Sequence, residues 1–108
     1  MSNVKEILIE GFMPFDANEN KKEMMELLGM LNLPSIGIRI FYNEYKFMTQ
    51  GTGQYCFYNF IIKGKEALSF PYLKHMVKIM LDNKCEITIA RSKDTEEGDD
   101  NPWVNLLP

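Results

Sequence analysis

The order in which apolar residues change their spacing along the chain is what most restricts the folds open to it. Residues 5–12 and 36–42 alternate apolar positions with a period of two, which is typical of half-buried strands. Residues 55–62 and 85–90 are also strand-like, because they are rich in aromatic and β-branched side chains. A helical spacing of apolar residues separates the first strand from the second, and the third from the fourth. The chain therefore predicts the element order βαββαβ.

Both expected helices have recognisable ends. The first is expected to open at Asp16, where Glu19 three residues later completes a capping-box pattern, and to end before Pro34. The second is expected to hold Pro71 in its first turn and to stop at Asn83. One apolar stripe marks each helix, formed by Met24, Leu27, Leu28 and Leu31 in the first and by Leu73, Met76, Val77, Met80 and Leu81 in the second.

The connection between the second and third strands is expected to be long. It covers residues 44–54 and closes in the bend Gly51-Thr52-Gly53, which joins two strands and does not open a helix. A glycine-rich phosphate loop needs a helix N-terminus behind it. The glycines at this bend therefore indicate a turn between antiparallel strands.

This element order predicts an α+β protein with the ferredoxin-like fold. Two strand–helix–strand units with right-handed crossovers form a four-stranded antiparallel sheet with two helices on one face. The domain is expected to cover residues 4–91, and residues 92–108 form an acidic C-terminal tail whose composition cannot bury enough apolar surface to fold. The other sheet face remains open to solvent or to a ligand.

Charge and composition narrow the class of partner and the compartment. Of the 15 acidic and 12 basic residues, five acids and two bases lie in residues 91–108, which leaves residues 1–90 neutral. A neutral body is not the charge pattern of a strong double-helix binder. No apolar run approaches the roughly 20 residues of a membrane-spanning helix, no secretory signal is visible, and two cysteines make no disulfide scaffold. A cytoplasmic protein is expected, and the Lys- and Asn-rich composition suggests an AT-rich source such as a phage genome.

The side chains on the open face follow from the strand period. Isoleucines of the first, second and fourth strands, Ile87 and Ile89 among them, are expected to face the helices, which leaves Ala90 outward. In the third strand, Cys56, Tyr58 and Phe60 are expected inward. The outward set expected to bind a ligand is Leu8, Arg39, Phe41, Tyr55, Phe57 and Asn59. Flat rings beside a guanidinium can stack unpaired bases, each worth about 1–3 kcal/mol.

Two segments carry a resemblance to a known family. Residues 7–12 (ILIEGF) look like a first-strand hexapeptide and residues 53–60 (GQYCFYNF) like an aromatic third-strand octapeptide, so the chain resembles the RNA recognition motif family. The resemblance implies that Tyr55 and Phe57 stack bases of single-stranded RNA. The chain departs from the family pattern at Leu8, where the family has an aromatic ring, and at Gly53, where it has a basic residue.

An enzyme is not expected. The loop after the first strand has no arginine of the kind that acylphosphatases of this fold need, and no nucleophile, general acid or ligand set gathers in the sequence. The sequence thus predicts no catalytic residue, no metal and no cofactor.

Two functions of different classes remain open. The first is a non-catalytic module that binds single-stranded RNA on the aromatic sheet face. The alternative is a protein-binding inhibitor or adaptor, including one encoded by a phage, or a homodimer, using the same face or the tail. The tail could anchor such a partner through Trp103, Val104 and Leu106, an apolar group at the end of an acidic tether.

Overall fold

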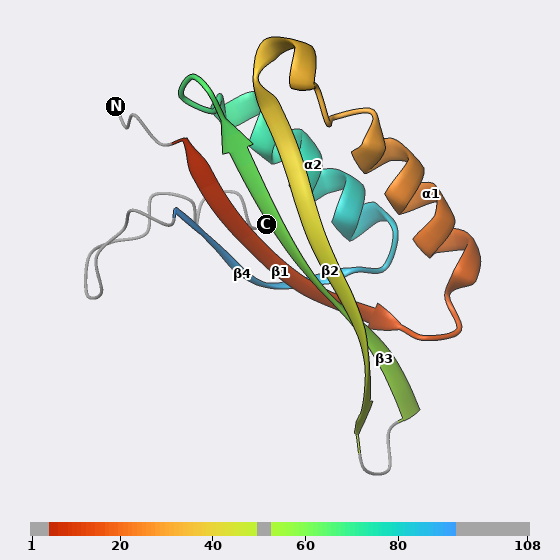
Figure 1. The fold of residues 1–108 in the computed structure, drawn as a ribbon. Helices are drawn as coiled ribbons and strands as arrows, with labels where there is room; N and C mark the ends of the chain where they lie inside the picture. The colour runs from red at the N-terminus through yellow and green to blue at the C-terminus, as the bar shows by residue number, and fades with distance from the viewer. Residues whose placement is uncertain (1–4, 50–52, 93–108) are drawn as a thin grey trace.

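The computed structural model describes residues 5–49 and 53–92, which form one sheet and the helices that cover it (Figure 1). The sheet is antiparallel, with strand order β2-β3-β1-β4, and both helices pack on the same face. The predicted ferredoxin-like βαββαβ fold is therefore confirmed. In chain order the elements are β1 (Glu6–Pro14), α1 (Asn18–Gly29), the 3₁₀ turn η1 (Pro34–Ile36), β2 (Ile38–Thr49), β3 (Gly53–Gly64), α2 (Phe70–Asp82) and β4 (Glu86–Ser92).

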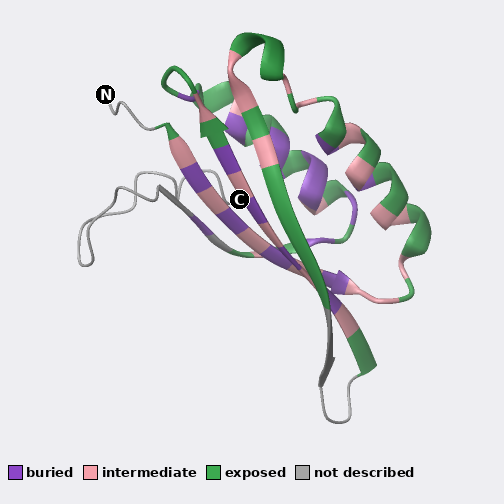
Figure 2. Ribbon diagram, in the orientation of Figure 1, coloured by how far each residue is buried: buried purple, intermediate pink, exposed green. Residues whose placement is uncertain are grey.

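The core lies between the sheet and the two helices. Burial alternates along all of β1 and along β3 from Tyr55 to Ile62, because every second side chain points toward the helices (Figure 2). Most of the residues predicted to face inward are buried here, among them Ile7, Ile9, Tyr58, Phe60, Met24, Leu28, Leu73, Met76, Val77 and Met80, while Leu27, Leu31, Ile38, Ile40, Leu81 and Ile87 are partly buried against this core.

Helix α2 has the ends that its sequence indicates. The Ser69 hydroxyl accepts a hydrogen bond from the Tyr72 N–H at 3.3 Å, and Pro71 occupies the first turn. At the other end Asn83 is the C-cap residue, and its buried side-chain amide donates to the Ile79 carbonyl at 2.9 Å. The predictions for Pro71 and Asn83 are confirmed.

Helix α1 starts later than predicted, and the prediction of a capping box formed by Asp16 and Glu19 is wrong. The helix begins at Asn18, its N-cap residue is Ala17, and no side chain caps it. Strand β1 continues to Pro14, beyond the expected break, and the Ala17 N–H donates to the Pro14 carbonyl at 3.1 Å to close the turn. Asp16 consequently lies within this turn, one position too early to cap the helix.

Strand β2 is displaced and much longer than predicted. Ile36 belongs to η1 and is 63% exposed, and Gly37 has a φ of 81°, so the strand cannot start at residue 36. The strand then runs through most of the expected connection, paired with β3 as far as Thr49 opposite Gly53. The expected long loop is therefore wrong, because these residues find hydrogen-bond partners across a hairpin. The bend itself lies outside the described residues except for Gly53, whose φ is 95°.

A β-bulge changes the face assignments of β4. The register against β1 shifts between Glu10 and Gly11, with Thr88 as the extra residue of β4. Ala90 consequently pairs with Ile9 and is buried, so its predicted outward position is wrong, while Ile89 pairs with Glu10. A Cβ at Gly11 would lie 2.6 Å from the Glu86 carbonyl oxygen, so only glycine allows β4 to come this close.

Within the described part of the chain, no helix is long and apolar enough to cross a membrane. The predicted acidic tail, apart from Ser92, lies outside the described residues, and so do its proposed anchors Trp103, Val104 and Leu106.

Candidate functional site

The predicted ligand-binding residues lie on the sheet face that the helices leave uncovered. Leu8 and Phe41 flank Ile61 in neighbouring strands, and Arg39 pairs with Lys63, all at outward positions. Burial of the alternating β3 residues fixes the side of the remaining members. The structure thus brings Leu8, Arg39, Phe41, Tyr55, Phe57 and Asn59 to one face.

Four rings gather on this face near the β2–β3 hairpin, and we refer to Phe12, Tyr45, Tyr55 and Phe57 as the aromatic cluster. Phe57 stacks on Tyr45, with ring centroids 5.8 Å apart and planes at 11°. Phe12 lies 5.5 Å from Phe57 and meets Tyr55 edge-on at 5.6 Å. Tyr45 is 47% exposed, while the other three are partly buried against each other. The cluster is therefore an ordered surface and not a set of separate rings.

Phe12 and Tyr45 were not predicted as site residues. In the first strand the sequence predicts Leu8 as the outward site residue, and Tyr45 falls in the predicted connection over residues 44–54. The available signal was the strand period itself, because the alternation continues from Glu10 to Phe12 and from Phe41 to Tyr45.

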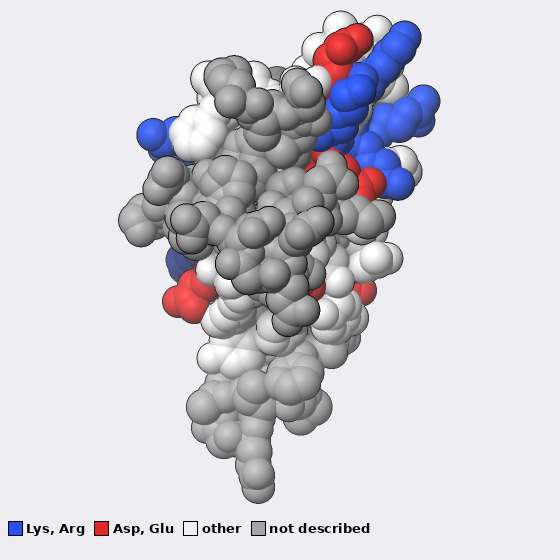
Figure 3. Space-filling model, turned by 90° about the vertical axis from the view of Figure 1, so that its left-hand side faces the viewer, with Lys and Arg blue, Asp and Glu red and all other residues white. Residues whose placement is uncertain are grey.

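The opposite end of the same face is basic. Arg39 and Lys63 are exposed neighbours in β2 and β3, and the Lys63 ammonium lies 5.5 Å from the centroid of the Phe41 ring. This ammonium is also 3.4 Å from the Glu6 carboxylate, and the Lys63 side chain stays 55% exposed in this pair. Lys and Arg side chains gather at the upper end of this side of the molecule (Figure 3).

A polar band separates the basic end from the aromatic cluster. Glu10, Asn59 and Asn43 lie side by side on β1, β3 and β2. The Asn59 amide is within hydrogen-bond distance of the Glu10 carboxylate, and the Thr88 hydroxyl donates to the Glu10 carbonyl at 3.3 Å. Asn59 is thus on the predicted face, but engaged with a carboxylate.

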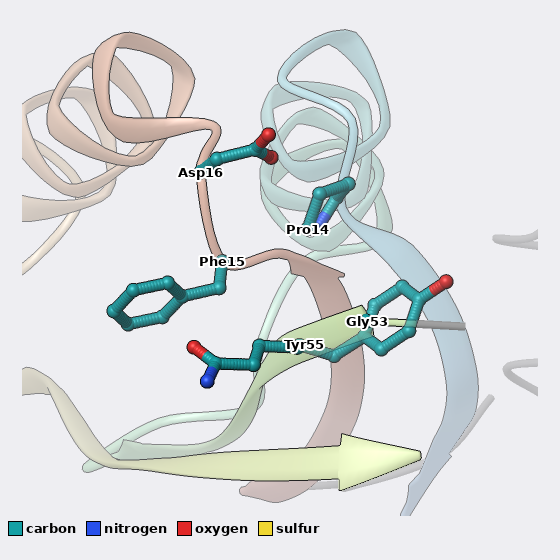
Figure 4. Close-up of a pocket in the computed structure, with 6 residues that line it drawn as sticks. Pro14, Phe15, Asp16, Gly53 and Tyr55 are labelled. Atoms are coloured by element: carbon teal, nitrogen blue, oxygen red, sulfur yellow. The ribbon is translucent and has the colours of Figure 1, made fainter. Parts of the chain in front are cut away.

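Two hollows flank Tyr55 where the face ends. One, of about 340 Å³, is lined by Pro14, Phe15, Asp16, Gly53, Gln54 and Tyr55, and the Asp16 carboxylate and Phe15 ring extend from the turn after β1 (Figure 4). The other, of about 550 Å³, is lined by Phe12, Pro14, Tyr55, Leu81, Lys84, Cys85 and Glu86. Because both include Pro14 and Tyr55, the Tyr55 ring stands between them, beside the aromatic cluster.

The two cysteines lie on the helix-covered side of the sheet, where both are buried in the core. Burial raises the pKa of the Cys85 thiol to about 12, so it stays protonated at neutral pH. Cys56 is also buried, and β1 separates the two cysteines, as the topology predicts. Among the described residues, no three His, Cys, Asp or Glu side chains are grouped so as to hold a metal ion.

No family model matches the chain, and no curated protein sequence matches it. Among solved structures, the chain is similar to the crystal structure of CutA1 from Pyrococcus horikoshii, with 11% sequence identity and a TM-score of 0.39 over 94% of this chain and 93% of that one. The architecture rests on the strand pairing, and this likeness adds no argument about function.

Proposed function

We propose that the protein is a non-catalytic module that binds single-stranded nucleic acid, RNA in the first place, on the open face of its sheet. The observation that carries the proposal is the aromatic cluster, an ordered group of rings on the side that neither helix covers. Unpaired bases stack on such rings whatever their sequence, with about 1–3 kcal/mol per base. The Tyr45 and Phe57 rings are the first candidates to receive a base.

The basic end gives the phosphate backbone a place to bind. Arg39 and Lys63 are six residues along their strands from Tyr45 and Phe57, which corresponds to about 20 Å at the rise of an extended strand. A single strand of a few nucleotides spans that distance. Stacking at one end and phosphate contacts at the other would then align the ligand along β2 and β3.

Binding of a fluorescein-labelled single-stranded RNA of mixed sequence, followed by anisotropy, tests the proposal. We expect Tyr55→Ala combined with Phe57→Ala to weaken the affinity by about tenfold or more. A matched pair on β2 separates the two faces, since Tyr45 is outward and Tyr42, which is 53% exposed, lies on the helix side. Tyr45→Ala should weaken binding, and Tyr42→Ala should not. Identical titrations for the wild type and the double variant would refute the proposal.

The second candidate is a protein partner on the same face. The carboxylate of Glu10 at the centre of the face, and Glu86 opposite Phe12, favour this candidate because they oppose a phosphate backbone. Salt separates the two functions: nucleic-acid affinity falls steeply as salt rises, whereas an aromatic protein interface responds little.

A further inference from the structure

The two edge strands of the sheet, β4 and β2, differ in length and in regularity. The β4 edge is seven residues long and is interrupted by the bulge at Thr88, a feature that discourages pairing with another strand. The β2 edge is twelve residues long, and its register against β3 is unbroken from Ile38 to Thr49. A long regular edge of this kind is a template for a further strand.

Within the described part of the chain, hydrogen bonds from outside the sheet reach the β2 backbone at its beginning. Leu33 and Ile38 exchange two backbone hydrogen bonds of 3.0 Å, and the Ile40 N–H donates to the Asn32 side-chain oxygen at 3.0 Å. Successive backbone groups of a strand alternate between its two edges. The N–H and C=O groups of Tyr42 therefore face the same outer side as those of Ile40, and in the described sheet β2 has a strand neighbour on one side only.

We propose that β2 pairs antiparallel with β2 of a second copy of this chain, about a twofold axis at Tyr45. This register sets Glu44 of each copy opposite Lys46 of the other, and Tyr42 opposite Met48. Lys46 of each copy thereby becomes a second cation beside the Glu44 carboxylate that Lys21 of the other copy already contacts at 2.8 Å, and opposite charges across strands favour pairing.

Neighbouring registers are less favourable. If the twofold axis lay at Glu44, the two Glu44 residues would be opposite one another, and if it lay at Lys46, the two Lys46 residues would be. Both registers therefore place like charges opposite each other. If the twofold axis lay at Tyr42 or Asn43, the ladder between the two copies would require the Ile40 N–H as a donor, and this group already donates to the Asn32 side-chain oxygen. Charge and hydrogen-bond availability thus favour a twofold axis at Tyr45 over one at Tyr42, Asn43, Glu44 or Lys46.

The pairing would join two four-stranded sheets into one. Four residue pairs that exchange two bonds each give about eight new backbone hydrogen bonds. Because the twofold axis is perpendicular to the sheet, all helices lie on one side and both open faces on the other. The two Tyr45 residues then meet at the joint, and the two aromatic clusters form one continuous surface. The pairing uses the edge and leaves the open face free, so it stands independently of the nucleic-acid proposal.

A charge-exchange experiment on the full chain tests the edge and its register together. Sedimentation velocity from low to high micromolar concentration should show a wild-type dimer. Lys46→Glu alone and Glu44→Lys alone each set like charges opposite, and each should weaken the dimer by about tenfold or more. An equimolar mixture of the two variants restores both opposite-charge pairs and should sediment as a dimer.

A second variant tests the proposed dimer by removing a backbone donor from the outer edge of β2. Tyr42→Pro removes an N–H that points to the outer edge, so the ladder with β3 is kept and the dimer should be lost. Because Glu44→Lys also removes the partner of Lys21, circular dichroism and the thermal midpoint of each variant confirm folding, with Lys46→Glu as the variant that spares this ion pair.

Three results would overturn the proposal: a wild type that is monomeric throughout, a mixture that stays monomeric, or a dimer lost in Tyr55→Ala/Phe57→Ala but kept in Tyr42→Pro. RNA titration of Tyr42→Pro tests the open face separately, because this variant keeps the aromatic cluster.

Discussion

The two faces of β3 carry the same kind of ring pair under opposite conditions. On the helix side Tyr58 and Phe60 stack at 5.7 Å with planes at 9°, and both are at most 1% exposed. On the open side Tyr45 and Phe57 stack at 5.8 Å and 11°. The ring distances and angles are nearly identical, although the inward pair lies along β3 and the outward pair lies across β2 and β3, and the two pairs differ most in what covers them.

Ring stacking alone therefore does not identify a binding surface. The inward rings belong to the core that methionine, leucine and valine side chains of α1 and α2 complete, whereas the outward rings lie on the sheet face opposite the two helices (Figure 1). If this contrast is correct, inward substitutions should act on stability and outward ones on binding.

The largest expected effect is a loss of stability on the helix side of β3, and the contrast between the two faces would be wrong if this loss were not larger than on the open side. Phe60→Ala should lower the free energy of unfolding by about 3–5 kcal/mol, because it leaves a cavity under the helices. Phe57→Ala, on the partly exposed side, should cost about 1 kcal/mol. Urea unfolding of the two variants measures both values, and equal losses would mean that the open face is also core.

The dependence of stability on alkaline pH tests whether the helix-covered side of the sheet excludes water. Burial raises the pKa of Cys85 from 9.0 and of Tyr72 from 10.0 to about 12, and raises that of Tyr58, which also has Glu44 nearby. The folded protein retains these protons while the unfolded chain loses them. Stability should therefore be constant below about pH 9 and fall above it, by up to about 1.4 kcal/mol per pH unit for each group.

Urea unfolding at pH 8, 9.5 and 11 measures this decline. Cys85→Ala is the control, because it should remove the part of the loss that begins at the thiol's ordinary pKa. A stability that stays flat up to pH 11 would contradict a sealed helix side.

The basic end of the open face should affect salt dependence more than affinity. Arg39→Gln with Lys63→Gln should weaken RNA binding a few-fold and reduce the slope of log K against log salt by about 0.7 for each phosphate that is no longer neutralised. Lys74→Gln with Lys78→Gln, on the exposed surface of α2, is the matched control and should leave the slope unchanged. Equal slopes for both pairs would remove Arg39 and Lys63 from the site.

The smallest effect is expected where α1 meets β2. The Lys21 ammonium lies 2.8 Å from the Glu44 carboxylate, and this hydrogen bond raises the pKa of Lys21. Since both groups are about one-third exposed, Lys21→Met should lower stability by at most about 1 kcal/mol. A much larger loss in thermal unfolding would show that this ion pair, and not apolar packing, holds α1 to the sheet.

Sequence patterns predicted the fold and the faces of β3 where the strand period was regular and continuous. The Tyr55–Phe60 alternation was assigned correctly because the period of two continues without a break through the segment, and Phe60 pairs with the inward Ile9 of β1. The pattern failed where a tertiary feature shifted it by one residue, as at the Thr88 bulge, which moved Ala90 to the helix side.

Tyr45 shows a different limit. Polar residues interrupt the apolar pattern of β2 after Phe41, so the segment resembles a loop, yet hairpin pairing with β3 makes it a strand. The period of two from Phe41 to Tyr45 gives the correct face once the segment is a strand, but the long-range pairing that makes it a strand is not visible in its polar local sequence.

The most direct test of an open aromatic face that binds RNA is a nuclear magnetic resonance titration of the labelled protein with a short single-stranded RNA. We expect the aromatic resonances of Phe12, Tyr45, Tyr55 and Phe57 to shift, while those of Tyr58 and Phe60 stay in place. Shifts confined to α1 and α2, or no shifts at all, would contradict this function.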